Sequence, residues 1–264
     1  MESMQSANKD AAGSVLSVGG TESEAHGRVV KDYFAVTSKA GWAEAPADFS
    51  ARSLGLARGL GDWLDIAGLD VIDLGCGTGE LCWLLQDRGA RRVVGVNLSQ
   101  DEIDYAVRWG VKAEFVCEEI LAFLKGTPDE SVDRVYAMNI LEHLDKDHLV
   151  AVLEQCRRCL RPDGCLTAMV PNGISPYGTM TRYWDITHLL AFTPSSVVQL
   201  ERLCGFGDAL FREWGPRPYG LVSTVRYMIW QAIRQIIRFR LMVETGSDKG
   251  RIYTSDMLFR LTKR

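Results

Sequence analysis

The stretch Val71-Ile72-Asp73-Leu74-Gly75-Cys76-Gly77-Thr78-Gly79-Glu80 decides the fold of this chain. Its apolar beginning predicts a strand at 70–74, and the leucines at 81, 84 and 85 have the spacing of a helix over 79–88. The glycines between them let a ligand approach the main chain, next to the unsatisfied N–H groups of a helix N-terminus. The D-x-G-x-G-x-G spacing therefore predicts a ligand site, and it differs from the G-x-G-x-x-G of NAD-binding turns.

Strand and helix patterns alternate on both sides of this turn. Residues 28–65 have a helical pattern. Further strands are predicted at 91–96, 113–117, 132–138, 165–170, 208–214 and 251–261, and further helices at 101–109, 120–124, 148–160 and 193–205. This order predicts an α/β fold, a Rossmann-like seven-stranded, mostly parallel sheet with helices on both faces. Ligands of such sheets bind beyond the carboxyl ends of the strands.

Composition and length indicate one domain in a reducing compartment. The 264 residues suffice for one α/β domain with insertions. We expect a flexible N-terminal tail at 1–25, which lacks the apolar core of a secretion signal, and a domain over 26–264. The seven cysteines are an odd number and favour reduced thiols in the cytoplasm over disulfides. Cys156 and Cys159 form a lone C-x-x-C, for which helix packing is the simpler interpretation than a metal site.

Asp73, Gly75, Gly77 and Gly79 match the first motif of the class I S-adenosyl-L-methionine (SAM)-dependent methyltransferases, and the chain resembles this family. The resemblance implies SAM as the cofactor. It places the glycine turn, with Cys76, under the methionine and ribose parts of SAM, and Asp73 close to the methionine amino group. The alternative is a strand-to-helix turn without a ligand.

The resemblance also implies contacts at the ends of the next strands. The family usually has an acid where this chain has Asn97, and that acid accepts hydrogen bonds from the ribose hydroxyls. We expect Asn97 and its neighbour Leu98 to contact the ribose, with a weakened hold on SAM, because an amide has one accepting oxygen. Glu119 corresponds to the acid that accepts from the adenine amino group, and the N–H of Ile120 to the group that meets the ring. Which of Glu118 and Glu119 faces the cofactor stays open.

Asn139 opens the loop after the fourth strand, which in relatives lines the site around the transferred methyl. His143, in the same loop, is a candidate base because imidazole titrates near neutral pH. A related E-x-x-E-H pattern binds a divalent metal in some quinone and small-RNA methyltransferases. Here Asn139 replaces the first Glu, so we expect no metal, and a locally packed His143 is the structural alternative.

The segment after the fifth strand is rich in aromatic residues. Tyr177, Tyr183 and Trp184 are candidates to stack on a sugar ring or a flat acceptor. Asp185 and His188 lie three residues apart, a spacing that allows the carboxylate to orient the imidazole as a base. The run from Tyr183 to His188, with the later Ala-Phe-Thr-Pro-Ser-Ser, resembles methyltransferases associated with bacterial surface-polysaccharide synthesis. A structural histidine in a self-supporting loop is the alternative for His188.

A helical insertion is predicted at 217–250, between the sixth and seventh strands. Val225, Ile229, Ala232, Ile236, Phe239 and Val243 form one stripe of a helix over 221–243, and we expect Arg226, Arg234 and Arg238 on the opposite side. Residues 212–264 hold eleven Lys/Arg against four Asp/Glu in a chain of net charge −4. The stripe either docks on the domain or on a second copy, or it contacts an anionic membrane surface at the inner membrane face or a membrane-bound partner. Nucleic acid is not expected, since the rest of the chain is acidic.

These patterns favour a SAM-dependent methyltransferase that acts on a hydroxyl of a small molecule or glycan, such as a lipid-linked sugar. A quinone-type O-methyltransferase is an alternative. A SAM-binding scaffold or regulator without turnover is another, because Asn97 replaces the usual acid and the base is unproven. An NAD-dependent oxidoreductase fits the fold but not the glycine spacing.

Overall fold

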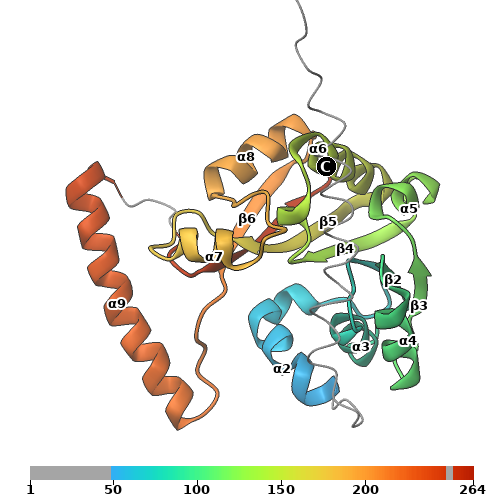
Figure 1. Ribbon diagram of the computed structural model, residues 1–264, viewed down its shortest axis with the longest axis horizontal. Helices are drawn as coiled ribbons and strands as arrows, with labels where there is room; N and C mark the ends of the chain where they lie inside the picture. Colours follow the sequence, from blue (N-terminus) through green and yellow to red (C-terminus); the bar gives the residue numbers. More distant parts are fainter. Residues whose placement is uncertain (1–48, 248–251) are drawn as a thin grey trace, which may run out of the picture. The chain divides into compact units, whose positions relative to one another are not determined.

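The computed structural model describes residues 49–247 and 252–264, in which seven strands form one sheet (Figure 1). They are β1 (Asp70–Leu74), β2 (Arg92–Asn97), β3 (Glu114–Cys117), β4 (Val132–Met138), β5 (Leu160–Pro171), β6 (Asp208–Glu213) and β7 (Asp256–Thr262). The order is β3-β2-β1-β4-β5-β7-β6; β1 to β5 pair in parallel, and β7 runs antiparallel to β5 and β6. The predicted mostly parallel sheet is confirmed. The expected tail at 1–25 and the helical pattern of 28–48 lie outside the described residues.

Helices occur where the sequence pattern predicts them, and α7 is an additional helix in the aromatic-rich segment after β5. They are α2 (Phe49–Leu60), α3 (Glu80–Asp87), α4 (Gln100–Arg108), α5 (Ile120–Gly126), α6 (Lys146–Cys159), α7 (Gly178–Trp184), α8 (Pro194–Leu203) and α9 (Leu221–Thr245). Side-chain caps fix several of their beginnings: the Ser99 hydroxyl accepts from the N–H of Glu102, and Asp145 accepts from that of His148.

Both faces of the sheet are covered, because successive residues of β1 join different cores. Val71 belongs to a buried cluster with Leu81 and Leu85 of α3. Ile72 belongs to a second buried cluster that includes Leu124 of α5 and Leu153 of α6. Since neighbouring side chains of a strand point to opposite faces, these two clusters lie on the two sides of the sheet.

The parallel strands end in register, which brings their following loops to one edge. Leu74, the last residue of β1, lies opposite Val96 in β2 and Ala137 in β4. Asn97, the last residue of β2, lies opposite Cys117 in β3. The loops that begin at Gly75, Leu98, Glu118 and Asn139 therefore leave the sheet at the same carboxyl edge.

The expected boundary between α6 and β5 is wrong. We expected the helix to reach Leu160 and the strand to begin at Cys165, with the turn residues between them. The structure ends α6 at Cys159 and starts β5 at Leu160. The register shifts between the pairs Val132↔Leu160 and Arg134↔Cys165, so the intervening residues form an irregularity inside the strand, with Asp163 at a φ of 63°.

The seventh strand begins at Asp256 rather than at residue 251, because the side chain of Asn172 holds the residues before it. The fully buried Asn172 Nδ2 donates to the carbonyls of Ile252 (2.7 Å) and Thr254 (2.8 Å), and its Oδ1 accepts from the N–H of Ile174 (3.1 Å). The end of β5 is thereby tied to the chain that enters β7.

The insertion between β6 and β7 contains the predicted helix, α9, which ends at Thr245 with Gly246 in the left-handed conformation (φ 71°). Among its residues only Ser223 is buried. No helix within residues 49–247 and 252–264 combines the length and the hydropathy needed to cross a bilayer.

Candidate functional site

The glycine turn after β1 requires glycine for two different reasons. Gly75, Gly77 and Gly79 have φ values of 70°, 50° and 85°, a region that other residues rarely adopt. A Cβ on Gly75 would lie 2.7 Å from the Ile140 side chain, whereas a Cβ on Gly77 would meet nothing within 4 Å. Gly75 is thus needed for packing, while Gly77 borders open space. That space agrees with a turn that a ligand covers.

Asp73 lies beneath this turn and is 2% exposed. Burial, with a smaller contribution from the charge of Glu80, raises the pKa of its carboxyl to about 7, although the Cys82 thiol donates to Asp73 Oδ2 at 3.4 Å and opposes the shift. A carboxylate in such a place gains most from a nearby cation. The amino group of SAM, which the resemblance places here, would be such a cation.

Arg52 of α2 reaches the same turn, a contact that was not predicted from the sequence. Its guanidinium pairs with Glu80 and lies 3.4 Å from the Thr78 hydroxyl and 3.2 Å from the Tyr105 hydroxyl. Thr78 in turn donates to Glu80 at 2.8 Å. No spacing rule links a residue of α2 to the N-terminus of α3.

At the end of β2, Asn97 is almost buried, and its amide is held by Glu102 of α4. Asn97 Nδ2 donates to Glu102 Oε2 at 2.8 Å, and both side chains are less than 7% exposed, at 4% and 6%. Leu98, the other expected ribose contact, is 51% exposed. Glu102 was missed, although its four-residue spacing from the buried Ala106 was a signal that it faces inward.

Glu119 acts as the N-cap of α5. Its two carboxylate oxygens accept from the N–H groups of Leu121 and Ala122, both at 2.9 Å, and His148 Nε2 lies 3.0 Å from Oε1. The following Ile120 is buried in the core. Glu118 is exposed, and its N–H donates to the Asn97 carbonyl at 3.1 Å. Both acids thus stay at the carboxyl edge, and the adenine contact of Glu119 stays a prediction.

Asn139 starts the loop after β4 in the left-handed conformation, with a φ of 55°. This geometry, which Asn tolerates better than most residues, turns the chain into a 3-10 helix over Leu141–His143. The Glu142 carbonyl then accepts from the N–H groups of Leu189 (2.8 Å) and Leu190 (3.0 Å). The main chain of this loop therefore holds the segment that follows α7.

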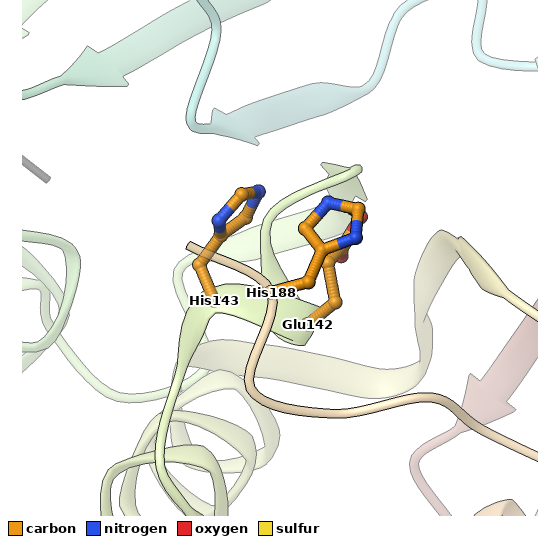
Figure 2. Close-up of side chains that lie close together, drawn as sticks. All are labelled: Glu142, His143 and His188. Carbon is orange, nitrogen blue, oxygen red and sulfur yellow. The ribbon is translucent and has the colours of Figure 1, made fainter. Parts of the chain in front are cut away.

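That contact brings two predicted histidines together with an acid that the sequence did not single out. Figure 2 shows Glu142, His143 and His188 gathered in one place, and one ligand atom of each lies within 4.8 Å of the others. The imidazole rings meet edge to face, with centroids 4.8 Å apart. His188 Nε2 lies 3.9 Å from Glu142 Oε1.

Hydrogen bonds set the tautomer of each ring. His188 Nδ1 lies 3.0 Å from the Thr181 carbonyl, which only accepts, so Nδ1 carries the proton and Nε2 the lone pair of the neutral ring. The Thr187 hydroxyl donates to Asp185 Oδ1 at 2.6 Å and therefore accepts from His143 Nδ1 at 2.7 Å. The lone pair of His143 is again on Nε2.

Asp185 takes a different place from the expected one. We predicted that its carboxylate orients His188, but the contact between them is made by the main chain, where the His188 N–H donates to the Asp185 carbonyl at 3.3 Å. The carboxylate instead reaches His143 through Thr187. The reason is that residues 185–188 turn tightly enough for Asp185 Oδ1 to accept from the Thr187 N–H at 2.8 Å.

Glu142 is an unusual acid, since it is 1% exposed and its Oε2 has no hydrogen-bond partner within the described parts of the chain. Burial raises its pKa to about 8, and the charges of Asp256 and Asp185 add to the effect. The pKa of Asp256 in β7 is also raised by burial, against the charge of His188. The site therefore concentrates carboxyl groups around two imidazoles.

The aromatic residues before this cluster are open to solvent. Tyr177, Tyr183 and Trp184 are 60%, 74% and 80% exposed, and Ile186 is 83% exposed. They belong to α7 and its ends, the same segment that supplies Thr181, Thr187 and His188.

Chemically, this arrangement can take up a proton or hold a cation. Two imidazole Nε2 atoms and one carboxylate oxygen are a donor set that suits a divalent transition metal. Asn139, which replaces the first acid of the E-x-x-E-H pattern, offers an amide oxygen in place of a charged ligand. The same Nε2 atoms are the groups that would act as bases.

Comparisons with known proteins agree with the glycine turn. A sequence model described as a methyltransferase domain matches residues 71–164. A ubiquinone biosynthesis O-methyltransferase of Bradyrhizobium diazoefficiens is 32% identical over 120 residues, which are 45% of this chain and 43% of that protein. A tRNA U34 carboxymethyltransferase of Aeromonas salmonicida is 30% identical over 162 residues, 54% of this chain and 46% of that protein. The chain thus spans less than half the length of these two relatives.

Solved structures share the fold. A SAM-dependent methyltransferase of Archaeoglobus fulgidus has a TM-score of 0.60 at 22% identity, over 82% of this chain and 95% of that one. The magnesium protoporphyrin IX methyltransferase of Synechocystis, solved with bound SAM, has a TM-score of 0.55 at 15% identity, over 90% and 97% of the two chains. Residues 71–164 are thus similar to a methyltransferase domain, and the chain has the fold of SAM-dependent methyltransferases of known structure.

Proposed function

We propose that this protein transfers a methyl group from SAM to a hydroxyl of a small-molecule or glycan acceptor. One observation carries the proposal: the open glycine turn after β1 and the two histidines that face Glu142 are built on strand ends of the same sheet edge. A methyl donor held at the first and a proton acceptor at the second are what transfer to a hydroxyl requires.

On this proposal the cofactor half of the site consists of the turn from Gly75 to Gly79 and the polar residues beside it. Asp73 receives the amino group of SAM, Asn97 and Leu98 the ribose, and Glu119 and Ile120 the adenine. Asn139 borders the methyl group. The residues fit this ligand for two reasons. Gly77 leaves space above the turn, and none of the groups that shift the pKa of the buried Asp73 is a cation.

The sulfonium of SAM supplies an already activated methyl group, so the protein mainly has to align the acceptor and remove its proton. We assign the base to His143, with His188 as the second candidate. His143 Nδ1 bonds to Thr187, and Thr187 bonds to the Asp185 carboxylate, so the negative charge of Asp185 stabilises the imidazolium that forms. His188 is held by a neutral carbonyl instead.

The exposed aromatic residues Tyr177, Tyr183 and Trp184 support a flat or ring-shaped acceptor, which would cover them on binding. A sugar, including one of a surface polysaccharide or a lipid carrier, has such a shape. A quinone-type ring has it too, and one relative acts in ubiquinone biosynthesis.

Calorimetry with SAM tests the cofactor half. Gly77→Arg would fill the open space, and we expect it to abolish measurable binding while the protein stays folded. Gly110→Arg is the matched control, because Gly110 also has a positive φ (89°) and open space around its Cβ position. Equal SAM binding by wild type and Gly77→Arg would refute the cofactor site.

Labelled SAM, incubated with sugar and quinol acceptors, tests the transfer. Transfer by wild type and its loss in His143→Gln support the enzyme. Tight binding of SAM without transfer to any acceptor would favour the alternative, a SAM-binding scaffold or regulator.

A second candidate concerns the same three side chains. The unpartnered, buried Glu142 Oε2 beside two imidazoles favours a divalent cation as an aid to acceptor binding. The cation would occupy the lone pairs that a base needs, so the two uses exclude each other. Thermal unfolding with EDTA and then with zinc, manganese or magnesium distinguishes them: a cation site raises the midpoint in wild type but not in Glu142→Gln, whereas a base site leaves both unchanged.

We further propose that α9 rests on an anionic membrane surface. Its apolar stripe does not dock on the described residues: Val225, Ile229, Ile236, Phe239 and Val243 are between 49% and 70% exposed. The opposite side carries Arg234, which pairs with Glu213 of β6 at 3.1 Å. The stripe therefore faces away from the sheet.

Charge decides between the possible occupants of this stripe. Arg226, Arg238 and Arg240 are exposed along the helix, with Glu244 as its acid. A second copy would bring the same positive charges together, whereas anionic lipid headgroups complement them. Sedimentation with vesicles distinguishes a lipid surface from a protein partner. Pelleting with phosphatidylserine vesicles at low salt supports the membrane, and dimerisation without pelleting would assign the stripe to a second copy.

A further inference from the structure

Asn97, the last residue of β2, differs from the acid that the methyltransferase family usually has where the ribose of SAM is recognised. The usual acid would present two equivalent oxygens, and Asn97 presents one oxygen and one NH2 group. An amide in this place can turn either end toward the ligand. With the NH2 group toward the ribose, Asn97 could not accept from the hydroxyls.

Glu102 fixes which end faces the ligand. Its Oε2 accepts from Asn97 Nδ2 at 2.8 Å, and an ionised carboxylate can only accept, so the NH2 group must point at Glu102. The Asn97 carbonyl oxygen then points the other way. A second, longer contact of Nδ2 with the Ser99 carbonyl, at 3.5 Å, favours the same orientation.

The local structure explains why Glu102 can lie there. It belongs to the first turn of α4, where the N-cap Ser99 accepts from its main-chain N–H, and acids are favoured at helix N-termini. Its side chain is 6% exposed, whereas Asp101 and Asp104 of the same helix are exposed. The helix therefore turns one of its three early acids inward, against Asn97.

The pair also explains why an acid at position 97 would be unfavourable in this chain. Two carboxylates at hydrogen-bond distance repel, so one of them would have to hold a proton. The pair of Asn97 and Glu102 keeps a single negative charge and a fixed acceptor. The negative charge that the family usually has at the end of β2 is here on Glu102 of α4.

We infer that Glu102 is a positioning residue for the nucleoside part of the cofactor: it orients the Asn97 carbonyl to accept from a ribose hydroxyl of SAM and so compensates for the missing acid. This inference rests on the proposed function, because it assumes that SAM occupies the edge above β2. It replaces the expectation of a weakened hold on SAM.

Calorimetry with S-adenosylhomocysteine and with its 2′-deoxy and 3′-deoxy analogues tests the inference. In Glu102→Gln the amide of Asn97 is no longer fixed, and we expect the affinity for S-adenosylhomocysteine to fall about tenfold. The affinity for the analogue that lacks the recognised hydroxyl should fall by less than about threefold. Asp104→Asn, an exposed acid of the same helix, should leave all three affinities unchanged.

A double variant supplies the rescue. Asn97→Asp alone places two carboxylates together and should weaken binding, whereas Asn97→Asp with Glu102→Gln exchanges donor and acceptor and should restore binding to within about threefold of wild type. Thermal unfolding shows that each variant is folded.

Several outcomes would overturn the inference. One is an unchanged affinity in Glu102→Gln, and a second is an equal loss for all three ligands, which would mark Glu102 as merely structural. A double variant as weak as Asn97→Asp alone is a third. If wild type fails to bind S-adenosylhomocysteine at all, the proposed function falls together with this inference, whereas the first three outcomes leave the proposed function intact.

Discussion

The two halves of the proposed site, one for the cofactor and one for the acceptor, are constructed differently. The cofactor half, at the ends of β1 and β2, depends on main-chain geometry: glycines with positive φ and side chains such as Asp73 and Asn97 that are buried to 2% and 4% exposure. The acceptor half, after β4 and β5, depends on side chains from distant segments, where His143 meets Thr187 and Glu142 meets His188. A common cofactor needs a fixed cradle, whereas acceptor recognition is built from loops that vary.

The largest expected effect is the loss of activity on substitution of His143, the proposed base in the acceptor half. Once a methyl acceptor is identified, His143→Gln should lower kcat by about 10²–10⁴-fold, since it removes the proposed general base. Thr187→Val, which breaks only the bridge to Asp185, should lower kcat by about tenfold. Steady-state kinetics with KM and kcat separated measure both. If His188→Gln has the larger effect and Thr187→Val none, the base is His188.

A pair of glycine substitutions tests the cradle. Gly75→Ala meets Ile140 at 2.7 Å in addition to its φ of 70°, so we expect a loss of about 2–4 kcal/mol in the free energy of unfolding. Gly77→Ala suffers only from its φ of 50° and should lose about 1–2 kcal/mol. Urea denaturation measures both. Equal losses would contradict the distinction between a packed and an open glycine.

The pKa of Asp73, raised to about 7, makes the cradle sensitive to pH. Because the folded state raises this pKa above its unfolded value of about 3.9, the protonated form favours folding; the contribution is complete below pH 4 and disappears as pH rises through 7. Stability of the ligand-free protein should therefore fall between pH 4 and 7, by up to about 1.4 kcal/mol per pH unit from this group.

Binding of a cationic amino group should show the opposite trend, with affinity for S-adenosylhomocysteine rising as pH approaches 7, by up to about tenfold per unit. Asp73→Asn should remove the pH dependence of both stability and binding. Any pH dependence that remains in this variant would come from other buried acids such as Glu142. Identical pH profiles of unfolding and binding in the two proteins would show that Asp73 does not carry the effect.

The smallest expected effect concerns α9. Arg226→Gln with Arg240→Gln should reduce pelleting with phosphatidylserine vesicles by about fivefold to thirtyfold, since each arginine near an anionic surface contributes about 1 kcal/mol. Arg108→Gln with Arg202→Gln, exposed arginines of α4 and α8, form the control. Equal pelleting of the two double variants, or no response to salt, would argue against an electrostatic contribution.

The sequence was sufficient for the sheet because its local rules are strong. Apolar runs predicted the bounds of β1 and β4 to the residue, and the glycine pattern predicted a turn between β1 and α3. The helix α9 was also predictable, since the apolar stripe from Val225 to Val243 repeats over about five turns. The β5 boundary was not, because Arg161 to Gly164 look like a turn that ends a helix, and only the partner strand β4 shows that the chain stays in the sheet.

Site contacts were harder to predict than strands because they join residues that are far apart in sequence. The bond of Asn97 to Glu102 spans five residues, and inward spacing in α4 hints at it. The link of His143 to Thr187 spans 44 residues, and that of Arg52 to Glu80 joins two helices. No local pattern encodes such pairs, so the histidines were predicted as candidates while their partners were not.

The tie between β5 and the entry to β7 has a chemical consequence. Asn172 precedes Gly173, and an asparagine before glycine is the pair most prone to cyclise and lose its amide nitrogen. Here the attacking nitrogen, the N–H of Gly173, is bonded to the Phe192 carbonyl at 2.7 Å, and the amide is held on both sides. Deamidation requires these hydrogen bonds to open. The rate at which aspartate appears at position 172 would therefore report how often β5 and the entry to β7 separate.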